Sequence, residues 1–278
     1  MTTRTRTATP RHFLMCSPEF FEVTYEINPW MDVNRGTDTA RAVRQWEVLR
    51  ETYLSWGHTV ELIDPVQGLP DMVYAANGAT VVDGLVYSAR FRYPERAAEG
   101  PLYQKWFADQ GFVTQTAAEV NEGEGDILMV GDAILGGSGF RTDVAAHAEL
   151  AALTGREVVS LELVDPRFYH LDTALAVLDS SPETPEIGYY PPAFSAASQA
   201  VLAARYPDAI MASDSDAVAL GLNAVSDGRR VVVAPGAVDL AAQLRERGFE
   251  PFGVDTSELL KGGGGAKCCT LEIRHAQP

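Results

Sequence analysis

Two adjacent cysteines near the end of the chain have the surroundings of a reactive thiol. Cys268 and Cys269 follow four glycines, residues 262–265, and glycine lets a backbone approach a ligand closely. A thiolate is a strong nucleophile, and its pKa falls beside a cation such as Lys267 or beside backbone N–H groups. The alternative for each cysteine is a small apolar residue packed in the core. An alternating strand is predicted to begin here, so the two cysteines face opposite sides. We predict Cys268 as the nucleophile and Cys269 as a packed residue.

A histidine and an aspartate two residues apart supply the best acid–base pair. His170 and Asp172 lie at the start of a predicted strand over residues 171–178. That spacing puts both side chains on one face, where the carboxylate can orient the ring. The pair would also suit a metal, but no further histidine or cysteine lies at a useful spacing, so no metal site is predicted. The remaining alternative is a structural histidine.

An acidic segment offers a site for a planar cation. Glu122, Glu124 and Asp126 are interleaved with two glycines just before a predicted hairpin. Glycines allow close approach, and clustered carboxylates suit a guanidinium group. The alternative is a solvated charged turn. Arg96 and Arg141 are candidates for binding a carboxylate, and the alternative for each is a surface arginine.

The bulk composition limits the partners. The net charge of the 278 residues is −16, which argues against nucleic acid and against an anionic membrane surface but is compatible with a small cationic substrate. Three cysteines, two of them adjacent, exclude a disulfide framework and favour a reducing compartment. The start of the chain has no apolar signal core, and no stretch approaches the roughly 18 apolar residues of a membrane span. A cytoplasmic protein is predicted.

The predicted elements alternate without a linker that would divide domains. We expect a disordered segment over residues 1–10 and a single domain over residues 11–278. Helices are predicted at 38–56, 96–108, 143–154, 195–205 and 237–247, hairpins at 79–88, 125–136 and 221–234, and strands at 12–16, 60–63 and 187–190.

A weak internal repeat suggests how these elements are arranged. Polar residues sit at the start of a strand or hairpin at intervals of about 45 to 51 residues; they are Asn77, Asp126, Asp172, Asn223 and Cys268. Five such units would close into a ring with their loop ends pointing at a shared centre. The predicted fold class is therefore α/β, a five-unit αβ propeller. The alternative is an open α/β sheet with hairpin insertions.

Several motifs, taken together in this order, resemble the guanidine-modifying enzymes of the pentein superfamily. They are EINPWM at 26–31, NGA at 77–79, GDILMVGD at 125–132, FRT at 140–142, HLDT at 170–173 and the segment 262–270. The resemblance runs from residue 13 to residue 274. Dimethylarginine dimethylaminohydrolase, arginine deiminase and arginine dihydrolase are members. The resemblance implies a five-unit propeller with pseudo-five-fold symmetry and an axial active site.

The resemblance also implies roles for single residues. Cys268 is similar to the family nucleophile, because a Cys-x-Ser/Thr motif follows the glycine loop and Thr270 fills its last place. His170 is similar to the general acid/base. Arg96 and Arg141 resemble the arginines that bind the substrate's α-carboxylate. The resemblance also places Asp126 and Asp172 among the residues that bind the substrate.

Two departures from the family pattern point to one branch. Deiminases and dimethylargininases carry a carboxylate where this chain has Asn77, and an acid three residues before Asp126, where it has Gly123. The arginine dihydrolase pattern has a Glu-Gly-x-Gly-Asp loop and asparagines at the positions of Asn28 and Asn77. Glu122 is therefore assigned as the guanidinium-binding carboxylate, with Glu124 as the alternative.

The implied function is hydrolysis of free L-arginine through a cysteine thiouronium, with ornithine, ammonia and carbon dioxide as products. A citrulline urea is neutral, so an amide that both donates and accepts can hold it better than a carboxylate. The alternatives are a dimethylargininase or deiminase, an amidinotransferase, and a non-catalytic arginine-binding protein. The chemistry needs no metal or organic cofactor. The expected partner is a small cationic amino acid, arginine or methylated arginine, and a homo-oligomer is left open.

Overall fold

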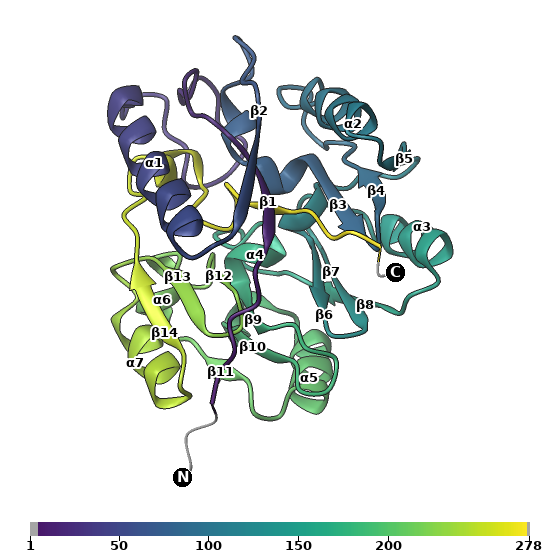
Figure 1. Cartoon of the computed structure of the whole chain (residues 1–278), viewed down its shortest axis with the longest axis vertical. Helices are drawn as coiled ribbons and strands as arrows, with labels where there is room; N and C mark the ends of the chain where they lie inside the picture. Colours follow the sequence, from purple (N-terminus) through teal and green to yellow (C-terminus); the bar gives the residue numbers. More distant parts are fainter. Residues whose placement is uncertain (1–4, 277–278) are drawn as a thin grey trace.

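Five small sheets form the core of the protein. The computed structural model describes residues 5–276, and there the strands assemble into five separate three-stranded sheets. Figure 1 shows the helices α1, α2, α3, α5 and α7 around the outside of the sheets. The predicted α/β propeller of five units is confirmed, and the open sheet is excluded.

Each sheet repeats one pattern, in which a first strand pairs antiparallel with a second and the second pairs parallel with a third. A parallel pair needs a long crossover, and in every unit a helix supplies it. The sheets are β15–β1–β2 (Leu271–Glu272, His12–Cys16, Thr59–Ile63), β3–β4–β5 (Ala79–Val82, Leu85–Ser88, Val113–Gln115), β6–β7–β8 (Ile127–Val130, Ala133–Ser138, Val158–Glu162), β9–β10–β11 (Leu175–Asp179, Glu186–Tyr189, Ile210–Met211) and β12–β13–β14 (Val225–Ser226, Arg230–Val233, Glu250–Gly253).

The crossover helices are α1 (Thr39–Ser55), α2 (Glu99–Asp109), α3 (Val144–Thr154), α5 (Ala196–Arg205) and α7 (Val238–Glu246). The local sequence explains where α1 begins. Asp38 caps α1 by accepting a hydrogen bond from the Arg41 backbone N–H, as expected for a carboxylate at that position. The helix buries one stripe, which includes Trp46 and Leu49, against the sheets.

The ring is closed by the two ends of the chain. β15 pairs antiparallel with β1, placing Phe13 opposite Glu272. The unit that contains the first strand is therefore completed by the last one, and Cys268 precedes that last strand. Among residues 5–276, no helix combines the length and apolar character needed to cross a membrane.

Two local predictions were wrong. The predicted strand 171–178 begins instead with a short helix, α4 (Leu171–Ala174), and the strand β9 starts only at Leu175. Side-chain hydrogen bonds favour the helical turn, because Asp126 accepts from the Leu171 N–H and Thr173 donates to the His170 carbonyl. Cys268 and Cys269 lie in a turn rather than a strand, since β15 begins at Leu271.

Other elements were not predicted at all. These are the strands β8 and β11 and the short helix α6 (Asp214–Val218). The predicted helix 96–108 begins at Glu99, which leaves Arg96 in the preceding loop.

Disorder was predicted for residues 1–10. Positions 1–4 of that segment lie outside the described residues. From residue 5 to 10 the chain has no helix or strand, yet the Arg6 guanidinium donates to Glu186 at 2.7 and 2.8 Å and lies over the Phe249 ring. The Thr9 N–H donates to the Asp227 carbonyl. The domain boundary at residue 11 stays a prediction.

Candidate active site

Six of the predicted site residues, together with Asn223, come from equivalent places in the five units. They lie in the turns that lead into the first strand of each sheet, so the ring brings the turns together. The other predicted residues, Asn28, Arg96 and Arg141, lie in loops elsewhere in their units. Asn77 precedes β3, Glu122 and Asp126 precede β6, His170 and Asp172 precede β9, Asn223 precedes β12 and Cys268 precedes β15.

The sulfur of Cys268 is held between two polar side chains. Its thiol donates to Asp172 Oδ2 at 3.2 Å, and Asn223 Nδ2 donates to the sulfur at 3.1 Å. Asn223 Oδ1 also accepts from the backbone N–H groups of Cys268 and Gly265, both at 3.1 Å. One asparagine thus fixes both the sulfur and the glycine loop, and only 2% of Cys268 is exposed.

Burial and charge keep the thiol protonated. Burial raises the pKa of Cys268 well above its usual value, and the neighbouring Asp172 carboxylate raises it further. Burial also raises the pKa of Asp172 to about 7, against a smaller lowering by Lys267 and by the Cys268 thiol. A cation placed beside these two groups would lower both pKa values, because an opposite charge favours the ionised forms.

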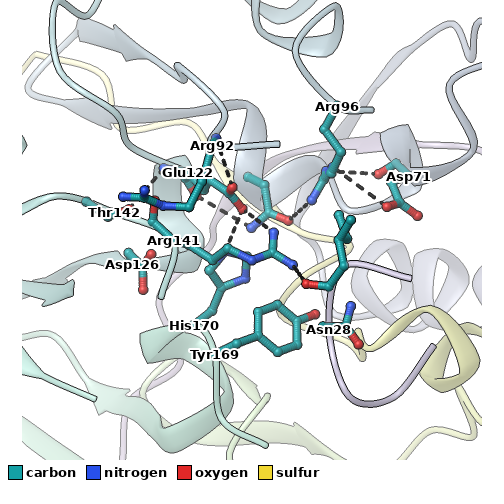
Figure 2. Close-up of polar contacts among 12 residues, drawn as sticks. Asn28, Asp71, Arg92, Arg96, Glu122, Asp126, Arg141, Thr142, Tyr169 and His170 are labelled. Carbon is teal, nitrogen blue, oxygen red and sulfur yellow. Dashed lines mark hydrogen bonds and ion pairs between the residues drawn. The ribbon is translucent and has the colours of Figure 1, made fainter. Parts of the chain in front are cut away.

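His170 and Glu122 form a second buried pair. His170 Nε2 lies 2.8 Å from Glu122 Oε2, and the same oxygen accepts from Arg141 Nη1 at 2.8 Å. Figure 2 shows the Glu122 carboxylate beside both partners, with the Tyr169 ring close to the Arg141 guanidinium. Burial alone would raise the pKa of Glu122, but Arg141 and His170 outweigh it and hold the pKa well below its usual range. Glu122 is therefore an ionised carboxylate that orients the histidine ring. The prediction that Asp172 orients this ring was wrong, because the turn after His170 directs the Asp172 carboxylate to the Cys268 sulfur instead.

The alternative acid, Glu124, serves a different cluster. It accepts from Lys267 Nζ at 2.8 Å and from the Glu272 backbone N–H at 3.0 Å, and it pairs with Arg274. Three donors thus hold its carboxylate among C-terminal residues. The contact with His170 favours Glu122 over Glu124 as the acid of the site.

Asn28 and Arg141 connect an N-terminal loop to the site. Asn28 Nδ2 donates to the Gly262 carbonyl at 3.1 Å, and Arg141 Nη2 donates to the Ile27 carbonyl at 2.8 Å. Gly263 has a φ of 94°, a left-handed conformation that favours glycine. Its own carbonyl accepts from the Tyr169 hydroxyl at 2.9 Å.

Arg96 and Asn77 form the remaining part of the site. Arg96 is 3% exposed, donates to both oxygens of Glu99, and donates from Nη1 to Asn77 Oδ1 at 2.8 Å. Its Nη2 also donates to the Asp71 carbonyl at 3.1 Å. All three guanidinium nitrogens of Arg96 therefore have acceptors in the protein, and one of those acceptors is the asparagine that marks the dihydrolase pattern.

Curated relatives match almost the entire chain. It is 58% identical over 268 residues to the N(G),N(G)-dimethylarginine dimethylaminohydrolase of Mycobacterium tuberculosis, covering 96% of this chain and 87% of that protein. The chain belongs to the guanidine-modifying hydrolases of the pentein superfamily. It is also 38% identical to the bifunctional arginine dihydrolase/ornithine cyclodeaminase ArgZ of Synechocystis, where the match covers 94% of this chain but only 37% of ArgZ. No family model matches the chain.

Solved structures show the same guanidine-modifying fold. The N-terminal domain of ArgZ, a cyanobacterial arginine dihydrolase, superposes with a TM-score of 0.90 at 36% identity, covering 95% of this chain and 98% of that domain. A dimethylarginine dimethylaminohydrolase adduct superposes with a TM-score of 0.76 at 19% identity, covering 95% of this chain and all of that one, which shows the fold alone.

Sequence reasoning about this guanidine-modifying hydrolase missed two partners of its site. The sequence singled out Asn223 only as one of the repeat positions. Because this position is equivalent to those of Asn77, Asp172 and Cys268, the repeat could have identified Asn223 as a site residue. Glu99 was missed entirely, although it lies three residues after Arg96 at the start of a predicted helix, a spacing at which charged side chains meet.

Gly125 lies so close to two side chains of the site that a substitution there tests whether their positions matter for catalysis. A Cβ at this position would overlap the amide nitrogen of Asn77 and come within 3.2 Å of the His170 ring. Because misplacement of catalytic groups by about 1 Å can cost 10²-fold in rate, Gly125→Ala is expected to lower kcat about 10²-fold. Steady-state kinetics beside a melting curve would check it; full activity in a folded variant would show that neither side chain needs this position.

Proposed function

We propose that the protein is an arginine dihydrolase, converting arginine and two waters to ornithine, carbon dioxide and two ammonia molecules. The observation that carries the proposal is a pair of asparagines beside the catalytic groups. Asn77 accepts from Arg96, and Asn223 donates to the sulfur of Cys268, with Asp172 and His170 in the same site. An asparagine can donate to a neutral urea oxygen, which a carboxylate cannot do.

The first round removes one terminal nitrogen of arginine. The guanidinium lies against Asp172, where its charge lowers the pKa of the Cys268 thiol. The thiol loses its proton to solvent, and the thiolate adds to the guanidinium carbon. His170, oriented by Glu122, protonates the nitrogen that leaves as ammonia and then takes a proton from the attacking water. The carbon–sulfur bond breaks, which releases citrulline and restores the thiolate.

The second round repeats the attack on citrulline. Cys268 adds to the urea carbon, a second ammonia leaves, and a thiocarbamate remains on the sulfur. Water releases a carbamate that loses carbon dioxide to give ornithine. The urea oxygen becomes negative as the sulfur adds, so a donor such as the Asn77 amide stabilises this step.

The geometry favours a division of roles among the charged residues. Asp172 is the carboxylate nearest the sulfur, so we assign to it the guanidinium contact that the sequence assigned to Glu122. Arg141, which lies between the Tyr93 and Tyr169 rings, is the proposed partner of the substrate's α-carboxylate. Asn28 and Asp126 support this binding by holding the loops beside Gly262 and Leu171.

Relatives support an amino-acid ligand. The N-terminal domain of ArgZ has been solved with substrate in a cysteine-to-serine variant, with product, and covalently bonded to a reaction intermediate in an asparagine-to-serine variant. A relative called AgrE has been solved with arginine and with ornithine. In ArgZ the two replaced positions are separated by nearly the same stretch of chain as Asn77 and Cys268 here, which supports the roles of both.

A second candidate is dimethylargininase, which hydrolyses methylated arginine to citrulline and methylamines. The 58% identity to the dimethylarginine dimethylaminohydrolase of Mycobacterium tuberculosis favours it. Both candidates use the same nucleophile and differ in the leaving group and in whether citrulline reacts further. A cytoplasmic location and a homo-oligomer remain predictions.

Product analysis separates the candidates. The protein is incubated with arginine and, separately, with asymmetric dimethylarginine, and the products are identified by mass. Ornithine from arginine is the expected result, with citrulline as a transient. Citrulline and dimethylamine from the methylated substrate, with no ornithine from arginine, would establish dimethylargininase instead. Turnover that depends on an added amine would indicate an amidinotransferase, and binding without product a non-catalytic protein.

A further inference from the structure

A chain of buried hydrogen bonds ends on the amide of Asn77. Glu99 is fully buried and clamps Arg96 with two contacts, Nε to Oε1 at 2.9 Å and Nη2 to Oε2 at 2.7 Å. This bidentate geometry fixes the plane of the guanidinium. The remaining nitrogen, Nη1, points at Asn77 Oδ1 and donates to it at 2.8 Å.

The clamp is built on rigid surroundings. Arg96 lies over the Phe91 ring at 4.6 Å, and its Nη2 also donates to the Asp71 carbonyl. The Asp71 carboxylate lies 3.9 Å from Arg96 Nε and accepts from the Tyr25 hydroxyl. Arg96 therefore has a fixed direction rather than the freedom of an exposed side chain.

Arg96 decides which way the Asn77 amide faces. A guanidinium has donors only, so it must meet the amide oxygen and not the amide nitrogen. The nitrogen is then turned the other way, towards the Glu122 carbonyl at 3.5 Å and towards Gly125, where a Cβ would overlap it. The His170 ring borders the same glycine, so the Asn77 nitrogen lies on the catalytic side.

We propose that Glu99 and Arg96 are positioning residues that turn the Asn77 amide nitrogen towards the reacting group and thereby determine whether the enzyme can process citrulline. The proposal rests on the proposed function, because it concerns the second round. The first round acts on a cationic guanidinium, which Asp172 can hold. The second acts on a neutral urea whose oxygen needs a donor, and an amide turned the wrong way would present an acceptor.

Glu99→Gln tests the proposal without touching a group that meets the substrate. A glutamine presents one acceptor and one donor to Arg96, so the bidentate clamp is lost and the Asn77 amide is no longer held. We expect the ratio of ornithine to citrulline formed from arginine to fall at least about tenfold, in line with the effect of removing an oriented donor. Citrulline formation is expected to stay within about threefold of the wild-type rate.

A matched control separates positioning from general damage. Asp227 is 1% exposed and, outside the site, its carboxylate accepts from the guanidinium of Arg230 three residues away at 2.7 Å. Asp227→Asn should lower the melting temperature by a comparable amount and leave the product ratio unchanged. If Asp227→Asn changes the ratio as much as Glu99→Gln does, the effect is general and the proposal is wrong. A rise in KM for arginine with an unchanged ratio would return Arg96 to binding the α-carboxylate.

A double-mutant cycle isolates the link to Asn77. If Glu99 acts through Asn77, then Glu99→Gln should have no further effect in an Asn77→Ala background, whereas independent effects would add. Additive losses would overturn the positioning role. Wild type that forms no ornithine would contradict the proposed function instead, and the same cycle measured on the free energy of unfolding would still decide whether the two residues are coupled through Arg96.

Discussion

Replacing Cys268 with serine is expected to lower kcat at least about 10⁴-fold, as is typical when the nucleophile of an enzyme is removed. The thiol is the group that Asn223 and Asp172 hold at 3.1 and 3.2 Å, and a serine hydroxyl there is a far weaker nucleophile. Binding should survive the exchange, because the carboxylate and the asparagine remain. Single-turnover kinetics and arginine binding by calorimetry would check both parts.

Cys269 provides the matched control. It is fully buried in the apolar cluster around Tyr53 and Trp46. Cys269→Ser should retain most of the activity while losing about 1–3 kcal/mol of stability, because a hydroxyl is buried in apolar surroundings. Loss of turnover in Cys269→Ser together with an active Cys268→Ser would move the nucleophile to the neighbouring position.

Asp172→Asn is expected to lower kcat/KM for arginine about 10³-fold and, at alkaline pH, to stabilise the fold. The activity falls because the variant loses the negative charge that faces the guanidinium beside the sulfur. The stability rises because the carboxylate is buried, and within residues 5–276 its Oδ1 has no hydrogen-bond partner. A side chain that is needed for catalysis can lower the stability of the folded protein.

The pH window follows from the direction of the shift. Burial raises the pKa of Asp172 from its ordinary value of 3.8 to about 7. Between these values the folded state keeps a proton that the unfolded state loses, so this residue makes stability fall as the pH rises from about 4 to about 7. Above pH 7 the whole cost is present, and Asp172→Asn should be more stable than wild type by up to about 4 kcal/mol, since each pKa unit corresponds to about 1.4 kcal/mol.

Urea unfolding at several pH values would measure this difference. Asp126 and Glu99 are also buried carboxyls with pKa values raised to about 6 and about 7, so the wild-type profile alone does not isolate Asp172. The difference between the wild type and the variant does isolate it, and it should vanish near pH 4. Equal stability of the two proteins at pH 8 would mean that Asp172 is not ionised at a cost in the folded state.

Several features of this protein could be predicted from the sequence because they depend on local chemistry and on repetition. The turn at Asp83-Gly84 is one, since both residues have positive φ, 49° and 83°, as a tight hairpin turn requires. The spacing of Asn77, Asp126, Asp172, Asn223 and Cys268 is another. Five similar units that each bury one sheet face have few arrangements other than a ring, and the five sheets confirm it.

The conformation of the site segments could not be predicted locally. The segment after His170 reads as a strand from its alternating apolar residues, yet it forms a helical turn. The decisive hydrogen bond comes from Asp126, which accepts from the Leu171 N–H and belongs to another unit of the ring. A carboxylate that is distant in sequence can override a weak local preference.

Only the tertiary structure determined which partner each charged group of the site contacts. The sequence placed Glu122, Glu124 and Asp126 near a guanidinium and Asp172 beside His170. It could not say that Glu122 orients His170, that Glu124 pairs with Lys267, and that Asp172 meets the sulfur. Residue types and spacing specify which chemistry is available. The direction of each side chain depends on contacts between units far apart in the chain, as when Glu122 meets His170 and Asp172 meets the Cys268 sulfur, and those contacts exist only once the ring has closed.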